Sequence, residues 1–416
     1  MRPPEKSSAS RSVPGPAGPA PRSVPVPVPV PGPAPGSVRR ASRRSVRVCL
    51  LAGLLALAPL AAGAAPAQAT GEAAVRASAL PALPAPDSHG LALRSWREVP
   101  GFGGRLGEAT FLTDAIFRPA GPGAPSIDPV RKPVKARILL PADYDPRKQY
   151  PVLYLLHGGA ADVEQWSKPD GGDIVETLRG TAFNGIVVMP EGGKAGWYSD
   201  WQGHTDGNFA PRWETFHIRR LLPWVDANFA TRADRSGRAV AGASMGGLGA
   251  LKYAAAHPDL FSAVGAFSGG TDIRPAAAQQ TVGDSLWFYG AAFSWTGLLD
   301  GKYRVTGSTS YRMSTVFGPS SGWAAFNPVQ VAGSEASYAA YDGRLALYAG
   351  TGEADIHGWN EDLHRPLRSR GVAHRYCTGP GGHEMRLWRE DLRNFVDYVY
   401  GSRARSCPNG WAPLAS

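Results

Sequence analysis

Short apolar runs rich in β-branched residues alternate with segments of helical periodicity along most of this 416-residue chain. Several runs, such as VLYLLH and GIVVMP, are apolar on both faces, as strands in the middle of a parallel sheet are. We therefore expect an α/β fold with helices on both faces of a mostly parallel central sheet. The expected strands are 134–141, 152–157, 185–190, 238–243, 262–267, 344–350 and 373–377, and the expected helices are 214–229, 246–256, 360–369 and 387–399.

The first 69 residues have the composition of an export signal. Residues 1–37 are mainly Pro, Ser, Ala and Val, so we expect a disordered head. Arginines follow, then an apolar run at 48–62 and small residues typical of cleavage after Ala69. The sequence SRRSVRV at 42–48 fits a twin-arginine signal and equally a Sec leader with a long basic head. We expect a secreted bacterial protein, either extracellular or associated with the cell wall.

Residues 70–87 are rich in Ala and Pro, which predicts a linker before the folded part of the chain. Beyond the linker we find no internal repeat, no charge block and no second Pro/Ser-rich break. We therefore expect one large domain over 88–416.

Most of the net charge of +10 lies in the leader. Nine of the 44 basic residues and one of the 34 acidic residues lie in residues 1–69, so the remainder carries 35 basic and 33 acidic residues. This near balance argues against a nucleic-acid partner or an anionic membrane surface. Cys49 is in the leader, which leaves Cys377 and Cys407, and both a disulfide that pins the C-terminal tail and a pair of buried thiols fit this pattern.

The sequence contains the pattern G-x-S-x-G twice, around Ser244 and around Ser320. A nucleophile elbow needs a strand that ends at the serine and a helix that starts just after it. Only Ser244 has this setting, because it follows the strand RAVAGA and precedes the helical GGLGALKYAAAH. The alternative for Ser244 is a helix N-cap after a glycine-rich turn.

A serine hydroxyl needs a base, and His383 lies on a glycine-rich loop after the last expected strand, where this fold class places it. The acid that orients the imidazole should follow the preceding strand. Of Glu353, Asp355, Glu361 and Asp362, Asp355 is the preferred candidate and Glu353 and Glu361 remain open. Two backbone N–H groups, of Met245 and of Gly159 in the HGG turn, should form an oxyanion hole. No motif indicates a metal or nucleotide cofactor, since HE at 383 lacks the second histidine of a zinc site.

Five stretches resemble, in order, the antigen 85 mycolyltransferase and esterase D group of α/β-hydrolases, over residues 134–400. They are YLLHGG, VVMPEGGKAGWYSDW, RWETFHIRRLLPWVDANF, GASMGGLGALKYAAAHPDLF and VFGPSSGWAAFNP, while the segment from 360 to 388 is more similar to secreted feruloyl- or acetyl-ester hydrolases. The resemblance implies the same serine, histidine, acid and oxyanion roles. It also implies that Tyr198, Asp200 and Trp201 line the cleft. A role as buried aromatic scaffolding explains these residues equally well.

Two features depart from the mycolyltransferases. Ala160 and Ala161 stand where those enzymes carry a sugar-binding arginine, and their acid lies within the following helix, which keeps Glu361 open. The aromatic-rich segment between 269 and 341 is either a cap over the cleft or core packing.

These features favour a secreted serine carboxylic-ester hydrolase acting through a Ser-His-Asp triad on an ester or acyl-lipid small molecule. The alternatives are an acyltransferase that moves an acyl chain to a sugar or lipid hydroxyl, and a non-catalytic binding protein of the cell wall.

Overall fold

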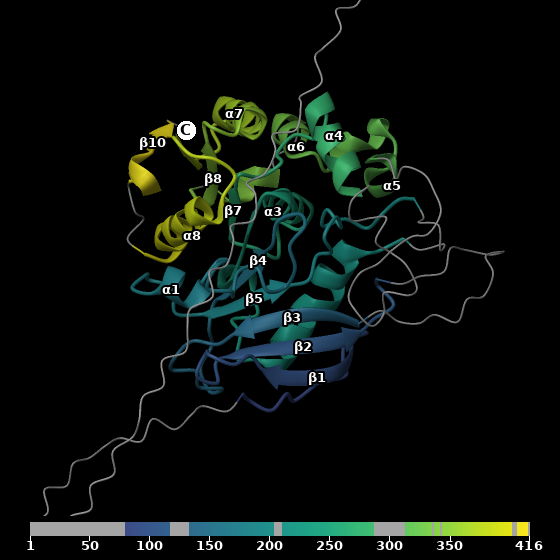
Figure 1. The fold of residues 1–416 in the computed structure, drawn as a ribbon, viewed down its shortest axis with the longest axis vertical. Coiled ribbons are helices and arrows are strands. Elements are labelled where there is room, and N and C mark those ends of the chain that lie inside the picture. Colours follow the sequence, from purple (N-terminus) through teal and green to yellow (C-terminus); the bar gives the residue numbers. More distant parts are fainter. Residues whose placement is uncertain are drawn as a thin grey trace, which may run out of the picture. The chain divides into compact units, whose positions relative to one another are not determined.

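The computed structural model describes residues 80–116, 133–203, 210–286, 313–334, 337–341, 343–401 and 406–414. Within these ranges ten strands form one sheet in the order β1-β2-β3-β5-β4-β6-β7-β8-β9-β10 (Figure 1). Neighbouring strands from β5 to β9 in this order run parallel, and β1, β2, β3 and β10 add antiparallel edges. The strands are β1 (Ala92–Glu98), β2 (Leu106–Leu112), β3 (Pro133–Leu139), β4 (Val152–Leu156), β5 (Ile186–Pro190), β6 (Arg238–Ala243), β7 (Ala263–Phe267), β8 (Leu345–Gly350), β9 (Arg375–Gly379) and β10 (Ala412–Leu414).

The seven strands expected from the sequence are all present, with ends shifted by no more than two residues. The expected mostly parallel sheet is confirmed. β1, β2 and β10 were not expected. β1 carries the polar residues Arg94, Ser95 and Arg97, and β10 is only three residues long, so neither shows the apolar run that identifies a buried strand.

Helices cover both faces of the sheet. The α-helices are α1 (Ile174–Leu178), α2 (Leu222–Asn228), α3 (Met245–Ala256), α4 (Ala276–Ser285), α5 (Met313–Phe317), α6 (Pro328–Ser334), α7 (Ala354–Ser369) and α8 (Met385–Tyr400). A π-helix spans Thr215–Leu221, and 3₁₀ turns span Arg235–Gly237, Ser320–Ala325, Ser337–Tyr341 and Pro408–Gly410.

Alternate side chains of β6 pack into two different hydrophobic cores, one on each face of the sheet. Val240 packs into a core that includes Leu248 of α3, whereas Ala239 and Ala241 face a second core that includes Phe395 of α8. All of β6 is buried, as a central strand between two helical layers must be.

The helix expected over 214–229 is present but is not uniform. Its first half is the π-helix, and α2 continues from Leu222 with Pro223 in its first turn. Proline has no N–H to donate to the preceding turn, which accounts for the widened segment directly before it.

The aromatic-rich segment between 269 and 341 is described only in part, and residues 287–312 lie outside the described ranges. Its described parts form α4, α5, α6 and two 3₁₀ turns. Phe317 and Phe326 stack on each other, and the buried Lys252 ammonium lies 5.1 Å from the Phe326 ring. These described aromatics therefore pack against α3, as core side chains do.

The packed region begins within the expected linker. The Trp224 indole donates to the Pro86 carbonyl at 2.9 Å, and Asn228 bonds both the N–H and the carbonyl of Ala85. These contacts to α2 order the chain before residue 88. None of the helices in the described ranges has the length and apolar character needed to cross a bilayer.

Candidate active site

Ser244 lies on a sharp turn between a buried strand and a helix. β6 ends at Ala243, α3 begins at Met245, and the Ser244 backbone has φ 55° and ψ −118°. A Cβ at Gly242 would lie 2.5 Å from the backbone carbon of Gly246. Glycine is therefore required beside this strained turn, which exposes the hydroxyl at the carboxyl edge of the sheet. The expected strand–turn–helix setting is present.

His383 reaches Ser244 from the loop between β9 and α8. Its Nε2 lies 2.8 Å from Ser244 Oγ, although 139 residues separate the two in the chain. The imidazole side chain is 37% exposed, so a substrate can contact it. This geometry lets Nε2 take the hydroxyl proton.

Glu353 holds the other side of the imidazole. Its Oε2 contacts His383 Nδ1, and its Oε1 accepts hydrogen bonds from Ser268 Oγ at 2.8 Å and from the Gly350 N–H at 3.2 Å. The side chain is only 3% exposed. Because an ionised carboxylate only accepts, Nδ1 donates to it and Nε2 is left to accept from Ser244.

The expectation that Asp355 holds the imidazole is corrected by this geometry. α7 begins at Ala354, which places Asp355 in the first helical turn, exposed to solvent, instead of on a loop. Glu361, two turns further on, lies 3.8 Å from His357. Neither carboxylate has a hydrogen bond to His383 among the described residues. Glu353 precedes the helix and is the carboxylate nearest the end of β8, a position that could have singled it out.

A second layer of residues supports the acid, and the sequence reasoning missed it. Trp388 Nε1 donates to Ser268 Oγ at 3.0 Å, and the Trp388 ring packs edge-to-face on His383 with 4.7 Å between ring centroids. Ser268 follows β7 directly and has φ 47°. Its place just after an expected strand is the one sequence feature that pointed to it.

The two expected oxyanion donors are the backbone N–H groups of Gly159 and Met245, and their neighbours differ from them in being hydrogen-bonded. The N–H of Gly158 is bound by Gln165 and that of Ala160 by the Lys194 carbonyl. Within the described ranges the N–H groups of Gly159 and Met245 have no acceptor. A Cβ at Gly159 would lie 3.9 Å from Met245 Cβ, so the two residues are neighbours, as an oxyanion hole requires.

Tyr198 and Trp201 are scaffold residues. Tyr198 is fully buried, and its hydroxyl donates to the His157 carbonyl at 2.8 Å. Trp201 is 4% exposed, and its Nε1 donates to the Gly196 carbonyl at 3.1 Å. The reading that these two aromatic side chains line a cleft is therefore replaced by the reading that they hold the loop after β5.

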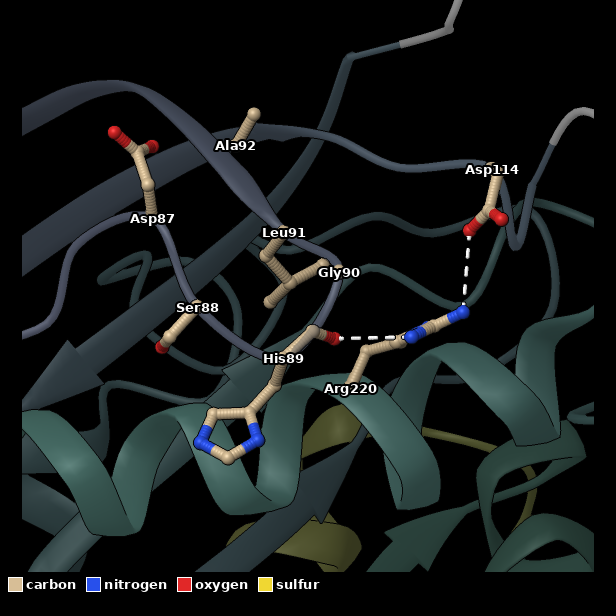
Figure 2. Close-up of a pocket in the computed structure, with 8 residues that line it drawn as sticks. All are labelled: Asp87, Ser88, His89, Gly90, Leu91, Ala92, Asp114 and Arg220. Atoms are coloured by element: carbon tan, nitrogen blue, oxygen red, sulfur yellow. Dashed lines mark hydrogen bonds and ion pairs between the residues drawn. The ribbon is translucent and has the colours of Figure 1, made fainter.

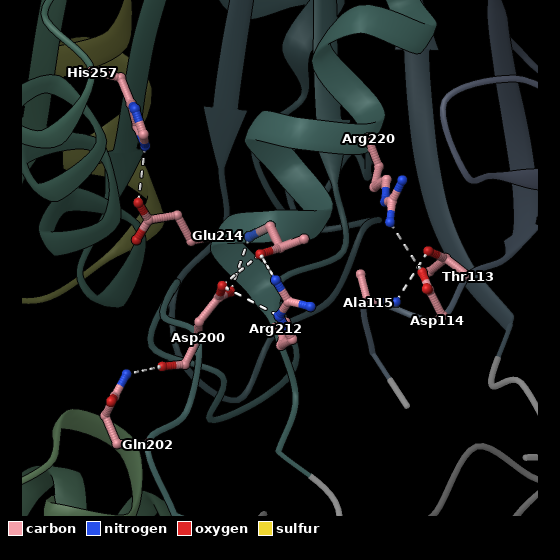
Figure 3. Close-up of polar contacts among 10 residues, drawn as sticks. Thr113, Asp114, Ala115, Asp200, Gln202, Arg212, Glu214, Arg220 and His257 are labelled. Atoms are coloured by element: carbon pink, nitrogen blue, oxygen red, sulfur yellow. Dashed lines mark hydrogen bonds and ion pairs between the residues drawn. The ribbon is translucent and has the colours of Figure 1, made fainter. Parts of the chain in front are cut away.

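Asp200 is partly exposed, but its carboxylate is also occupied. It accepts from the Thr215 N–H at 2.9 Å and from the Thr215 hydroxyl at 2.5 Å, and Arg212 lies 3.6 Å away. Figure 3 shows Asp200 turned toward Arg212 at the start of the π-helix. Asp200 thus fixes the end of the same loop, and it also lines a hollow of about 330 Å³ together with Glu214 and Lys252.

Two hollows differ in their relation to Ser244. One, of about 330 Å³, is lined by His383, Glu353, Asp355 and Trp359. Another, of about 370 Å³, is formed by residues 87–92 with Asp114 and Arg220, and it includes none of the residues around Ser244 (Figure 2). Arg220 spans that second hollow with bonds of 3.4 Å to the His89 carbonyl and to Asp114.

Similar proteins are esterases and acyltransferases. Esterase Rv1288 of Mycobacterium tuberculosis is 36% identical over 274 residues, which cover 62% of this chain and 55% of that protein. Diacylglycerol acyltransferase/mycolyltransferase Ag85A of Mycobacterium leprae is 30% identical over 223 residues, which cover 50% of this chain and 57% of that protein. The chain thus spans about half the length of these relatives.

The fold also has a counterpart among solved structures. Mycobacterium tuberculosis MPT51 aligns with 70% of this chain and 99% of its own, with a TM-score of 0.50 and 20% identity. With the parallel sheet and the strand–turn–helix at Ser244, this likeness identifies the α/β-hydrolase fold. The family described as Putative esterase matches residues 129–397. This chain therefore belongs to the Putative esterase family.

Proposed function

We propose that this chain is a serine carboxylic-ester hydrolase with Ser244, His383 and Glu353 as its catalytic triad. Ser244 Oγ attacks the ester carbonyl while His383 Nε2 takes its proton, and the N–H groups of Gly159 and Met245 bind the oxyanion. His383 then passes the proton to the leaving alcohol as the ester C–O bond breaks. Water, activated by the same imidazole, hydrolyses the acyl-enzyme and restores Ser244.

One observation carries the proposal. Ser244 Oγ, the His383 ring and the Glu353 carboxylate form an unbroken chain of hydrogen bonds from three separate loops. Glu353 is buried and further held by Ser268, so the imidazole is fixed in the tautomer that can accept the serine proton. A structural serine at a helix start would not need this alignment, which counts against a non-catalytic binding protein.

The test uses two serines from the two G-x-S-x-G patterns. Ser244→Ala should lower kcat for p-nitrophenyl butyrate by about 10⁶-fold, toward the rate left when a triad nucleophile is removed. Ser320→Ala, a surface change in the second pattern, is the matched control and should keep full activity. A fluorophosphonate probe should label the wild type and the Ser320→Ala variant but not Ser244→Ala. Labelling that persists without Ser244 would refute the assignment.

Acyl transfer is a second candidate because Ag85A, named an acyltransferase, is a relative. It shares the acyl-enzyme and differs only in the acceptor, which would be a sugar or lipid hydroxyl in place of water. We favour water. Supplying trehalose or glycerol with a butyryl ester and measuring acylated product against free butyrate decides between them, and transfer product in excess would favour the second candidate.

We also propose export of the chain. The basic and apolar leader over 1–69 supports it, and so does a disulfide between Cys377 and Cys407, since such bonds persist in oxidising compartments. Expression in a bacterial host should give protein in the medium whose sequence starts at Thr70. Replacing Arg43 and Arg44 by Lys should block export if the signal is of the twin-arginine kind, and should have little effect if it is of the Sec kind.

A further inference from the structure

The peptide unit between Gly158 and Gly159 carries one of the two proposed oxyanion donors, and its carbonyl is bound. His157 Nε2 accepts from the Gly192 N–H at 2.8 Å, so the proton of this imidazole is on Nδ1. Nδ1 lies 2.8 Å from the Gly158 carbonyl oxygen and donates to it. The C=O and N–H of a trans peptide point in opposite directions, so this bond sets the direction of the Gly159 N–H.

The preceding peptide unit, between His157 and Gly158, is bound at both ends. The Tyr198 hydroxyl donates to the His157 carbonyl at 2.8 Å. The Gly158 N–H donates to the side-chain carbonyl oxygen Oε1 of Gln165 at 2.7 Å. Because the two peptide units share the α-carbon of Gly158, any rotation of this unit would also turn the unit that carries the Gly159 N–H.

The following peptide unit is held by the backbone. Its N–H, that of Ala160, donates to the Lys194 carbonyl at 2.8 Å. Ala160 has φ 64°, a left-handed conformation that is unfavourable for a residue with a Cβ, so this turn needs a bond to hold it. Of the acceptors that hold the N–H groups on either side of Gly159, Gln165 is the one that a side chain supplies.

The backbone of Gln165 is itself fixed in place. Its N–H donates to the Asp162 carbonyl at 3.1 Å, and its carbonyl accepts from the Gly172 N–H at 2.7 Å. The next residue, Trp166, is 1% exposed and donates from Nε1 to the carbonyl of Leu156, the last residue of β4, at 3.0 Å. The Gln165 amide is therefore presented to the loop from a rigid turn.

Resting on the proposed function, we propose that Gln165 is a positioning residue of the oxyanion hole. Its side-chain carbonyl fixes the Gly158 N–H, and this keeps the Gly159 N–H directed at the substrate oxygen that becomes negative. A donor that is already in place needs no reorganisation when that charge develops. The Gln165 amide lies close to the reaction, since a Cβ built on Gly158 would lie 3.7 Å from Gln165 Nε2 and 3.5 Å from Ser244 Cβ.

The first test replaces Gln165 by a side chain of similar size that cannot accept a hydrogen bond. Gln165→Leu should lower kcat for p-nitrophenyl butyrate about five- to tenfold, the effect of losing one hydrogen bond. Formation and hydrolysis of the acyl-enzyme both pass through an oxyanion, so both should slow alike and KM should change less than about twofold. Gln280→Leu, the same change at an exposed glutamine of α4, is the matched control and should leave both constants unchanged.

A pair of ketone inhibitors separates positioning from a general loosening of the site. With butyl trifluoromethyl ketone, Ser244 Oγ adds to the carbonyl carbon, His383 takes the hydroxyl proton, and the carbonyl oxygen becomes an oxyanion in the hole. Butyl methyl ketone has the same butyl chain and binds without forming this adduct. Gln165→Leu should raise the Ki of the trifluoromethyl ketone about five- to tenfold and leave the Ki of the methyl ketone unchanged.

Two outcomes would overturn the proposal. An unchanged kcat in Gln165→Leu would show that the oxyanion hole does not depend on this side chain. An equal rise in Ki for both ketones, or a rise in KM as large as the fall in kcat, would make Gln165 a purely structural residue. Gln165→Ala should behave like Gln165→Leu and replaces it if the Leu variant does not fold. A wild type that hydrolyses no ester would instead refute the proposed function itself.

Discussion

Glu353 reaches His383 because two glycine-rich turns touch. The Gly352 N–H donates to the Gly381 carbonyl at 2.9 Å, and a Cβ at Gly352 would lie 2.6 Å from that oxygen. Only glycine permits this approach between the loop that carries the acid and the loop that carries the base. Asp355, one step into α7, is turned away from the contact by the helix.

The two carboxylates should therefore respond differently to loss of charge. Glu353→Gln should lower kcat for p-nitrophenyl butyrate by about 10⁴-fold, because the imidazole loses its tautomer and the stabilisation of its positive form. Asp355→Asn should keep kcat on this ester within about threefold, since the Asp355 carboxylate has no bond to His383 in the described ranges. Steady-state kinetics of the two variants side by side makes the comparison, and the reverse ranking would return the role to Asp355.

Ser268 positions the acid and does so in a strained conformation. Its hydroxyl donates to Glu353 while accepting from Trp388, and its φ of 47° is unfavourable for a side chain with a Cβ. Ser268→Ala should lower kcat about tenfold, as expected for loss of one hydrogen bond to a charged group.

Ser268→Gly separates this effect from stability. It removes the same hydroxyl, so kcat should fall equally, but it relieves the strain at φ 47° and should be about 1 kcal/mol more stable than Ser268→Ala. Urea unfolding and kinetics on both variants check this. If activity instead followed stability, with the Gly variant more active, Ser268 would be a purely structural residue.

At the scale of elements, α8 brings the proposed triad and a buried acid together. Trp388 of α8 packs on His383, and one turn later Asp391 is 1% exposed, with no hydrogen-bond partner for either oxygen among the described residues. Burial, with a smaller effect from Glu353 and Glu390, raises the pKa of the Asp391 carboxyl well above its usual range. The folded protein thus keeps the Asp391 carboxyl protonated to a higher pH than the unfolded chain does.

The pH dependence of stability follows from that direction. The unfolded chain ionises Asp391 near pH 4, whereas the folded protein does not, so this group's contribution to stability is complete below about pH 4 and is lost as pH rises. Asp391→Asn abolishes the titration. The stability of Asp391→Asn relative to the wild type should therefore be greater at pH 8 than at pH 4.5. Urea unfolding at the two pH values measures it. Glu390→Gln, the exposed neighbour, is the control, and an equal difference at both pH values would contradict the prediction.

At the scale of the whole molecule, the C-terminal tail is fastened near the loop of His383. Cys377 of β9 is bonded to Cys407, β10 pairs with β9, and the Trp411 indole donates to the Pro380 carbonyl at 3.0 Å. This bond confirms the expected disulfide and excludes the alternative of two buried free thiols. It closes a loop of 30 residues that includes α8, so it constrains the unfolded chain around the helix that packs on His383.

Removing the disulfide should affect the stability of the fold more than the rate of ester hydrolysis. Cys377→Ser with Cys407→Ser should lower the free energy of unfolding by about 2–4 kcal/mol, the usual effect of one such cross-link. Dithiothreitol should destabilise the wild type and leave the double variant unchanged. Urea unfolding in the presence and absence of the reductant measures both, and equal stability with and without the bond would contradict the expectation.

The sequence by itself determined the α/β class, the seven apolar strands and the positions of Ser244 and His383. These features are encoded locally: a doubly buried strand needs a continuous apolar run, and an elbow needs small residues within a few positions of the serine. A strand with polar residues, such as β1, or one of three residues, such as β10, lacks that pattern, which is why these outer strands were not foreseen.

Only the tertiary structure decided which carboxylate meets the base, which residues support it and whether the cysteines join. Four acids follow β8 within twelve residues, and the choice among them depends on where a helix begins and on how closely two glycine turns approach. Likewise the sequence left Tyr198 equally as a cleft residue or as buried scaffolding. The structure shows that it is buried, in an environment formed by Gly192, Gly249 and His157, which are far apart in the chain. Such contacts are set by the packing of distant segments, and no local pattern of residues encodes them.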